Sequence, residues 1–300
     1  MSITRATIVD ALDANLNEMH QDGLNGWGNE YQTIFNVGSS DKQSEVDSYE
    51  SGFGAMPEKT EGASATYDVI YPGISKTYTH LTYALGYEIT EEAIEDNLRT
   101  PETFNKLPQA LARSAEETVE ITAAAILNNG FSTNGFDGVP LFSTAHPLLG
   151  GGTQSNRPTV DADLSVTSLT AALTAIEKLV DERGLKSPVK ASRLVIPTDS
   201  WNLGVELLDS GFKPYVANNE VNALQKKELT WFVYHYLTDT DCWILLTEKI
   251  GHKLKFFWRV KPGALRKSTD FDSTNLKHLQ RMRFSVDYSH YMGTYGSPGA

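Results

Sequence analysis

Cysteine is almost absent from this chain, and that absence bounds both its fold and its compartment. Among 300 residues there is one cysteine, Cys242, so an intrachain disulfide framework is excluded and folding in a reducing cytoplasm is favoured. Cys242 lies between Asp241 and the apolar residues 243–246. That setting is typical of a buried structural thiol and not of a nucleophile.

Long hydrophobic runs are also missing. No stretch approaches the roughly 20 apolar residues that a membrane-spanning helix needs, and residues 1–7 lack the apolar core of a secretion signal. The sequence therefore predicts no membrane contact and no secretion. Hydrophobic residues still make up 40% of the chain and aromatic residues 10%, which suffices for one large or two ordinary globular domains.

Positive charge is scarce and unevenly placed. With 26 basic and 38 acidic residues the formal net charge is −12, which argues against a dedicated nucleic-acid-binding protein. Residues 1–100 hold 5 basic and 17 acidic side chains, whereas residues 248–300 hold 10 basic and 4 acidic ones. An acidic front and a basic tail favour head-to-tail contact between copies, because complementary fields steer association.

Catalytic signatures are missing as well. The sequence contains no phosphate-binding, dinucleotide-binding, zinc-protease or nucleophile-elbow motif. His146 stands beside Pro147 without other histidines or cysteines at ligand spacing, so we predict a hydrogen-bonding loop residue. The acidic pairs at 161 and 163 and at 239 and 241 lack the glycine and distal glutamate of a calcium loop and are interpreted as solvated turns. We predict no catalytic residue, no cofactor and no metal.

The longest apolar period predicts a helix from Leu107 to Asn128, with Pro108 near its first turn and Gly130 as its stop. Such a helix would be about 33 Å long. We interpret Glu116, Glu117 and Glu120 as its solvent-exposed face.

Several shorter elements complete an α+β pattern. The sequence predicts an N-terminal helix over 4–24 and a short helix that begins after the cap Thr90 and ends at Asn97. An exposed loop region is predicted over 131–163. Two further helices are predicted: one has Ser165 or Thr167 as its cap and Gly184 as its end, and the other has Asp199 or Ser200 as its cap and ends at Leu208. Strands are predicted at 193–196, 229–233, 243–246, 253–260 and 280–292.

Residues 52–96 stand out because they are extended and have little local structure to pack against. We predict strands at 66–71 and 76–88, joined by a turn at 71–74. A lone two-stranded hairpin is marginal in water. We therefore expect residues 45–90 to project from the body and to pack on another copy.

These residues carry a resemblance to a known family. It rests on Gly52-Phe53-Gly54, Glu61-Gly62, the turn Pro72-Gly73, Lys76 to His80, Leu85 to Glu91, Asp137-Gly138, Leu141 to Pro147 and the glycines 150–152. The segment from Gly52 to Met292 resembles the major capsid proteins of tailed bacteriophages, the Hong Kong 97-type shell proteins, and among them the Mu-like major head subunits.

The resemblance implies an α+β Hong Kong 97-type capsid fold. Its parts would be an N-terminal arm (1–44), an extended loop with a hairpin (45–90), a peripheral domain with a spine helix (91–163 and 247–300) and an axial domain (164–246). The protein would be a structural major capsid subunit of the virion, self-assembling in the host cytoplasm into the hexamers and pentamers of an icosahedral head around DNA that it binds without sequence specificity. A separate scaffold protein, a portal and a decoration protein are the further partners it implies.

Two alternatives remain open. An encapsulin-like nanocompartment shell would have the same fold but enclose an enzyme instead of a genome. A metal-dependent hydrolase, with His146, Asp161 and Asp163 near one site, would be a small oligomer stabilised by divalent metal.

The residues expected at contacts between copies fall into three groups. They are Phe53, Glu58, Glu61, Tyr67 and Tyr71 in the extended loop; Asn218, Asn219 and Asn222 in the loop 211–228, near the symmetry axis of a capsomer; and the basic residues Lys253, Lys255, Arg281 and Arg283. We expect the acidic loop of one copy to meet the basic residues of its neighbour, with the aromatic side chains supplying more of the affinity.

Overall fold

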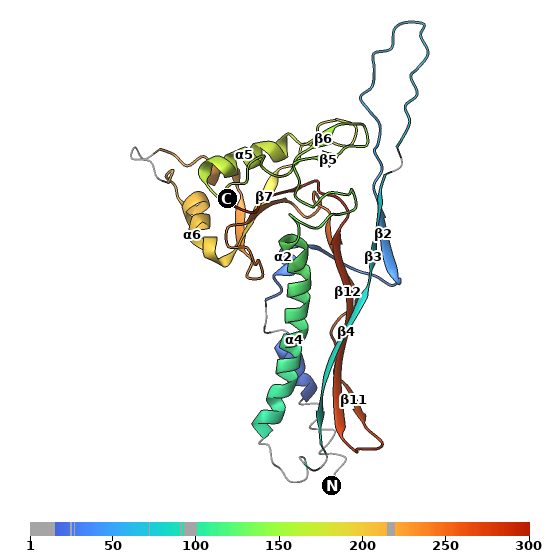
Figure 1. Cartoon of the computed structure of the whole chain (residues 1–300), viewed down its shortest axis with the longest axis vertical. Coiled ribbons are helices and arrows are strands. Elements are labelled where there is room, and N and C mark those ends of the chain that lie inside the picture. The colour runs from blue at the N-terminus through green and yellow to red at the C-terminus, as the bar shows by residue number, and fades with distance from the viewer. Residues whose placement is uncertain are drawn as a thin grey trace.

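The computed structural model describes residues 16–24, 26, 28–71, 73–90, 92, 101–214 and 220–300. A long helix lies beside a long sheet in the lower body, a compact unit sits above and to one side, and a loop projects from the opposite side (Figure 1). No helix in these described ranges is long and apolar enough to cross a membrane.

Helices are few, and one of them dominates. The α-helices are α2 (Tyr31–Ile34), α4 (Pro101–Asn128), α5 (Val166–Glu177) and α6 (Trp201–Gly204), and α6 continues as a π-helix over Val205–Asp209. Short 3-10 turns lie at Thr198–Ser200 and Leu224–Lys227, and residues 16–24 are also helical.

The strands form two larger sheets and two small ones. The strands are β1 (Asn36–Ser39), β2 (Ser44–Ser48), β3 (Ser75–Thr79), β4 (Leu81–Ile89), β5 (His146–Pro147), β6 (Thr153–Gln154), β7 (Ala191–Ile196), β8 (Thr230–Val233), β9 (Trp243–Thr247), β10 (Leu254–Val260), β11 (Arg266–Thr269), β12 (Leu276–Tyr288) and β13 (Thr294–Ser297). The predicted strands at 193–196, 229–233, 243–246, 253–260 and 280–292 are confirmed, with ends that shift by a few residues.

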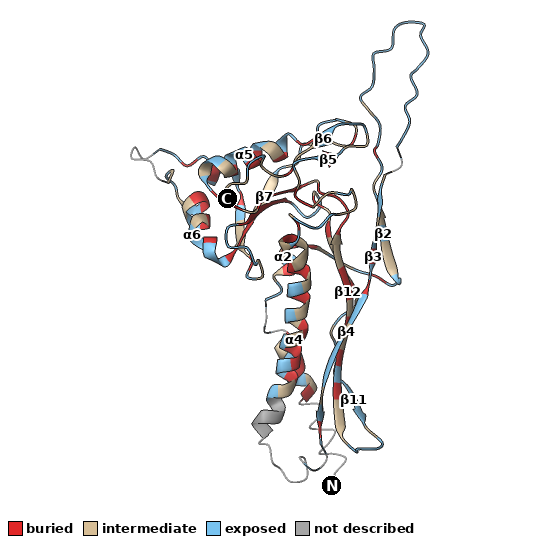
Figure 2. Cartoon of the chain, viewed as in Figure 1, coloured by how far each residue is buried: buried red, intermediate tan, exposed pale blue. Residues whose placement is uncertain are grey.

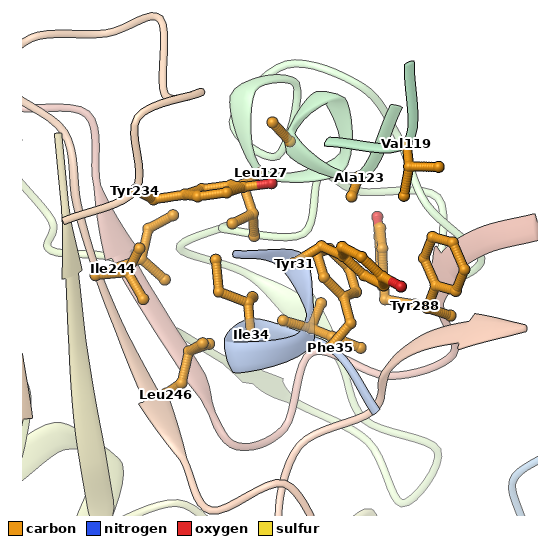
Figure 3. Packing of buried hydrophobic residues seen from close by; sticks show 14 of the residues in the cluster. Tyr31, Ile34, Phe35, Val119, Ala123, Leu127, Tyr234, Ile244, Leu246 and Tyr288 are labelled. Atoms are coloured by element: carbon orange, nitrogen blue, oxygen red, sulfur yellow. The ribbon is translucent and has the colours of Figure 1, made fainter. Parts of the chain in front are cut away.

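Strand β12 organises the lower sheet. It pairs antiparallel with β10, β11 and β4, and β1 adds to β10 in parallel. Helix α4 packs along this sheet, and the side chains of Val119, Ala123 and Leu127 lie close to Tyr31 and Ile34 of α2 (Figure 3). These residues belong to one apolar core that also includes part of β9.

Helix α4 begins earlier than the sequence predicted. It has 28 residues and starts at Pro101, with Pro108 inside it, so its length is about 42 Å. An interior proline removes one helical hydrogen bond. The buried face that starts at Leu111 and Ala115 offsets that loss, because Leu111 is buried and Ala115 belongs to the core that α4 shares with the sheet.

The hairpin predicted for the extended segment is wrong. Residues 66–71 form no strand, and the predicted strand 76–88 divides at His80 into β3 and β4, which belong to different sheets. His80 is buried, and its ring nitrogens lie 3.1 Å from Ser40 Oγ and 3.0 Å from Ser285 Oγ. These bonds fix the point where the chain changes sheets, so β3 pairs with β2 while β4 pairs with β12.

The upper unit is a four-stranded sheet in the order β13-β9-β7-β8, with α5 packed against it. Ser165 caps α5 as predicted, because its Oγ accepts a hydrogen bond from the Ser168 N–H in a capping box. The helix ends at Glu177, before Gly184, which instead turns the chain at φ +80°. The predicted side-chain cap of α6 is wrong, since a 3-10 turn precedes that helix and no side chain caps it.

Residues 131–163 are irregular apart from β5 and β6, as predicted, but they are not exposed throughout. Leu141 and Phe142 are fully buried, and the Phe142 ring lies 4.7 Å from that of Phe131. Gly130 and Gly296 approach Phe142 so closely that a Cβ on either would meet its ring at about 2.9 Å. Of the N-terminal helix predicted for 4–24, residues 16–24 are helical, and the helix predicted from Thr90 to Asn97 falls largely outside the described residues.

Truncating Phe142 should destabilise the subunit. We expect Phe142→Ala to lower the free energy of unfolding by about 3–5 kcal/mol, because it empties a site that glycines on two sides cannot refill. The control is Phe271→Ala, whose side chain is 97% exposed and which should change stability by less than about 0.5 kcal/mol. Urea unfolding of unassembled subunits measures both free energies. Equal stability of the two variants would contradict the role of Phe142 in the core.

Candidate assembly surfaces

A projecting loop, residues 49–71 and 73–74, leaves the body where the β2–β3 ladder ends and is exposed along most of its length (Figure 2). It carries large apolar side chains without cover: Met56 is 98% exposed and Tyr67 92%. Phe53 and Val69 are also mostly exposed. Four large apolar side chains within one segment of about 17 residues remain in water, and covering them would be favourable, so this loop has the character of a contact surface.

The base of the loop allows almost no variation. A Cβ on Gly73 would lie 1.1 Å from the carbonyl oxygen of Tyr49, so the two limbs approach too closely for any side chain there. The Ser51 Oγ accepts the Tyr71 N–H at 2.9 Å. Below this point Lys76 pairs with Asp287 of β12 at 2.6 Å. The loop therefore leaves from a rigid base.

The predicted charged residues have unequal roles. Glu58 and Glu61 lie exposed in the loop. Lys255 Nζ is 2.6 Å from Asp47 Oδ2 in the same subunit. Burial opposes the charge of Asp47, but the hydrogen bonds from Lys255 and Ser289 outweigh it and lower its pKa.

Among the other three basic residues, Arg283 Nε donates to the His80 carbonyl at 3.4 Å. Lys253 and Arg281 are half-buried. Lys255 and Arg283 therefore already have partners in their own subunit, and no loop glutamate of the same chain is among them.

The three asparagines predicted at contacts in the loop 211–228 also differ in their surroundings. Asn218 and Asn219 lie outside the described residues. Asn222 is buried; its Nδ2 donates to the carbonyls of Leu207 and Ser210, and its Oδ1 accepts the Leu224 N–H. The expectation that Asn222 hydrogen-bonds to a neighbour is therefore wrong, because its amide is used inside its own subunit.

His146 belongs to a buried polar cluster, as the hydrogen-bonding interpretation predicted. Its Nδ1 lies 2.6 Å from Asp137 Oδ2 and its Nε2 3.0 Å from Asn156 Oδ1, while its ring stacks on Tyr291 with centroids 3.7 Å apart. Burial and full hydrogen bonding indicate a structural role.

The residues of the hydrolase alternative do not converge. Arg157 holds Asp161 at 2.6 Å, and Asp163 accepts the N–H of Ala300. In the described part of the chain, no group of three or more His, Cys, Asp or Glu side chains is placed to hold a metal ion. Cys242 is buried as predicted, and burial, with Asp239 and Asp241 nearby, raises its pKa to about 12.

The interpretation of Glu120 as part of the solvent-exposed face of its helix is wrong. Instead of facing solvent it is 3% exposed. The Tyr31 N–H donates to both carboxylate oxygens at 3.1 Å, and the Tyr234 hydroxyl donates to Oε2 at 3.1 Å. Its spacing of four and seven residues from Ala124 and Leu127, both buried, was the available signal, because those positions share one helix face.

Two carboxyls on this helix have perturbed acidity. Burial raises the pKa of Glu120 to about 7, against the opposing hydrogen bonds from Tyr31 and Tyr234. Burial and the charge of Glu120 raise the pKa of Glu116 to about 7. Glu120 joins α4 to α2 and to Tyr234 just after β8, so its protonation state bears on how three elements are held together.

The sequence matches the phage capsid protein family over residues 73–293, well over half the chain. The chain belongs to that family. No curated protein matches it. The protein is thus a structural subunit of a phage capsid shell and not an enzyme, and the hydrolase alternative is wrong.

Solved structures agree on the fold. The chain is similar to the procapsid of bacteriophage JBD30 (TM-score 0.52, 18% identity, 98% of this chain and 76% of that one). It is similar to the mature capsid of bacteriophage PhiM1 (0.56, 10%, 87% and 83%). It is also similar to a virus-like particle from Pyrococcus furiosus (0.52, 12%, 95% and 98%). The expected α+β Hong Kong 97-type fold is confirmed, and the Mu-like subfamily stays a prediction.

The capsid subunit should become less stable as pH rises through neutrality. Because the pKa of Glu120 is raised above its unfolded value of 4.5 to about 7, folding takes up a proton; its stabilisation is complete below about pH 4.5 and is lost as pH rises through about 7. We expect Glu120→Gln to flatten this decline by on the order of 2–3 kcal/mol. Urea unfolding of unassembled subunits between pH 5 and 8 measures it.

The control for that comparison is the exposed Glu248→Gln, which should keep the wild-type slope. A Glu120→Gln variant with an unchanged slope would show that Glu120 carries a charge throughout this range.

Proposed function

We propose that this protein self-assembles into the hexamers and pentamers of an icosahedral phage head, with the projecting loop of each copy lying on a neighbour. The observation that carries the proposal is the exposed apolar surface of the loop, above all Met56 and Tyr67. An extended segment with no core of its own becomes favourable only when another surface covers these side chains.

Within that head the two larger sheets have separate roles. We assign the sheet of β12 and helix α4 to a peripheral domain (91–163 and 247–300) and the sheet of β7 and β9 to an axial domain (164–246). The pairing of β4 with β12 supports moving residues 81–89 from the extended loop (45–90) to the peripheral domain. The described residues 211–214 and 220–228 lie at the end of the upper unit away from α4 (Figure 1), which supports a place near a capsomer axis.

The enclosed cargo is DNA, bound without sequence readout, because a chain with net charge −12 has no excess of cations to form a specific nucleic-acid interface. A separate scaffold protein, a portal and a decoration protein complete the head, which is assembled in the host cytoplasm. An encapsulin-like nanocompartment shell would share this fold, and the likeness to the virus-like particle from Pyrococcus furiosus concerns the fold alone. Purified particles distinguish the two, since one contains nucleic acid and the other an enzyme.

Removing the loop tip should abolish shell closure. Replacing residues 55–66 by a short glycine–serine link keeps both Gly54 and Asp68. The Gly54 N–H donates to the Asp68 carboxylate at 2.8 Å, so the base of the loop should fold normally. We expect soluble subunits or capsomers and at least a hundredfold fewer closed shells by electron microscopy and sedimentation, because the shortened loop lacks Met56 and no longer reaches the neighbour. Closed shells at wild-type yield would refute the docking role of the loop.

Charge should govern the rate of assembly more than its endpoint. We propose that Glu58 and Glu61 approach Arg281 and Lys253 of a neighbour, with exposed pairs each contributing about 0–1 kcal/mol. Light scattering should show assembly slowing as salt rises from about 0.05 to 0.5 M, where the screening length falls from roughly 14 to 4 Å.

A charge reversal tests the same contact directly. Arg281→Glu should slow assembly severalfold, and adding Glu58→Lys and Glu61→Lys should restore part of the rate. Lys186→Glu, on an exposed residue of the upper unit, is the matched control for net charge. No recovery in the combined variant, or faster assembly in salt, would mean that the charge asymmetry has another cause.

A further inference from the structure

Glu182 and Arg183 are successive residues that hold different parts of the molecule. Glu182 is buried; its Oε1 lies 3.0 Å from His290 Nε2 and its Oε2 accepts the Leu149 N–H at 2.7 Å. Burial opposes its charge, yet these hydrogen bonds lower its pKa. Arg183 instead reaches the projecting loop. The turn that carries both is therefore anchored in the body on one side and bound to the loop on the other.

The contact between Arg183 and the loop is specific. Nη2 lies 2.7 Å from both carboxylate oxygens of Asp68, Nη1 donates to the Val69 carbonyl at 3.5 Å, and the guanidinium carbon lies 4.8 Å from the centroid of the Tyr71 ring. The Arg183 side chain is only 14% exposed. A planar guanidinium serves a carboxylate and an aromatic face at once, which a lysine cannot do.

Asp68 extends this contact to the other limb of the loop. Its Oδ2 accepts the Gly54 N–H and its Oδ1 the Val69 N–H, both at 2.8 Å. The hydrogen bonds from Gly54 and Val69, with that from Arg183, lower the pKa of Asp68. One carboxylate thus joins the outgoing limb, the returning limb and the body.

The support behind Arg183 is rigid. Asp181 Oδ1 accepts the N–H groups of Arg183 and Leu185 at 2.9 and 2.8 Å. The Glu182 carbonyl accepts the Gly150 N–H at 2.9 Å, and Gly184 completes the turn at φ +80°. A guanidinium on such a turn has little freedom, so it can fix the direction of the segment that it binds.

We propose that Arg183 is a positioning residue that fixes the direction in which the projecting loop leaves the body and thereby sets the rate of shell assembly. The inference rests on the proposed docking of the loop on a neighbour. Without Arg183 the part of the loop beyond its rigid base varies more in direction and presents its apolar tip in the competent direction for a smaller fraction of the time. The apparent affinity of one subunit for the next falls in proportion to that fraction.

Loop direction can be measured without assembly. Spin labels at Lys59→Cys in the loop and Lys178→Cys, exposed beside α5, report their distance distribution in unassembled full-length subunits; Cys242 is buried and should not label. We expect Arg183→Gln to widen the distribution at least twofold and Arg183→Lys to widen it less.

The chain offers a matched control. Arg157 also pairs with an aspartate, Asp161 at 2.6 Å, and lies over an aromatic ring, Phe131 at 5.3 Å, but it does not touch the loop. Arg157→Gln should leave the distribution unchanged. An unchanged distribution in Arg183→Gln, or equal widening in Arg157→Gln, overturns the positioning role.

Assembly kinetics provide the second readout. We expect Arg183→Gln to reduce the assembly rate about five- to tenfold and Arg157→Gln to leave it within twofold. A wider distribution with an unchanged assembly rate overturns the link between loop direction and assembly. The replacement of residues 55–66 separates the two proposals: if that variant closes shells, the docking function fails, whereas if it does not and Arg183→Gln behaves as wild type, only the positioning role fails.

Discussion

The pairing of β12 with three other strands is the constraint on which the rest of the structure depends. Its 13 residues bind β4 along one edge and β10 and β11 along the other, and α4 covers the face that carries Met282 and Phe284. Because β4 continues β3, and β3 enters the loop base, the same strand sets where the projecting loop starts. Core packing and the projecting loop are therefore linked through the continuous segment from β3 to β4.

The projecting loop shows a different balance of forces. Its limbs lie so close that Gly73 has no space for a side chain against Tyr49, so the loop is rigid at its base. Its outer part has few contacts of its own, and its apolar side chains remain in solvent. A subunit on its own keeps this unfavourable surface, and under the proposed docking a neighbouring copy would bury it and so favour assembly.

Buried polar groups hold the elements in register. Glu120 joins α4 to α2 and Tyr234. His146, paired with Asp137, and His290, paired with Glu182, both stack on Tyr291. Each of these groups would be costly to leave unpaired in the interior. They therefore specify one arrangement of the upper unit, the lower sheet and the loop base.

Local patterns in the sequence account for part of the helix and strand content, because apolar periods such as Leu169, Leu173 and Ile176 in α5 involve only neighbouring residues and were read correctly. The strands β1, β2, β11 and β13 were not predicted. The sequence by itself also determined the family, through the order of short motifs along the chain, and the presence of a long exposed segment. Periodicity could not show which strands pair: residues 76–88 are one strand by composition, and only the bonds of His80 to Ser40 and Ser285 divide them. The burial of Glu120 and of Asn222 was likewise decided by tertiary structure, because both depend on partners that are distant in sequence or on a loop that folds back. Local propensity is a property of neighbouring residues, whereas burial and charge pairing depend on contacts that exist only after the chain has folded.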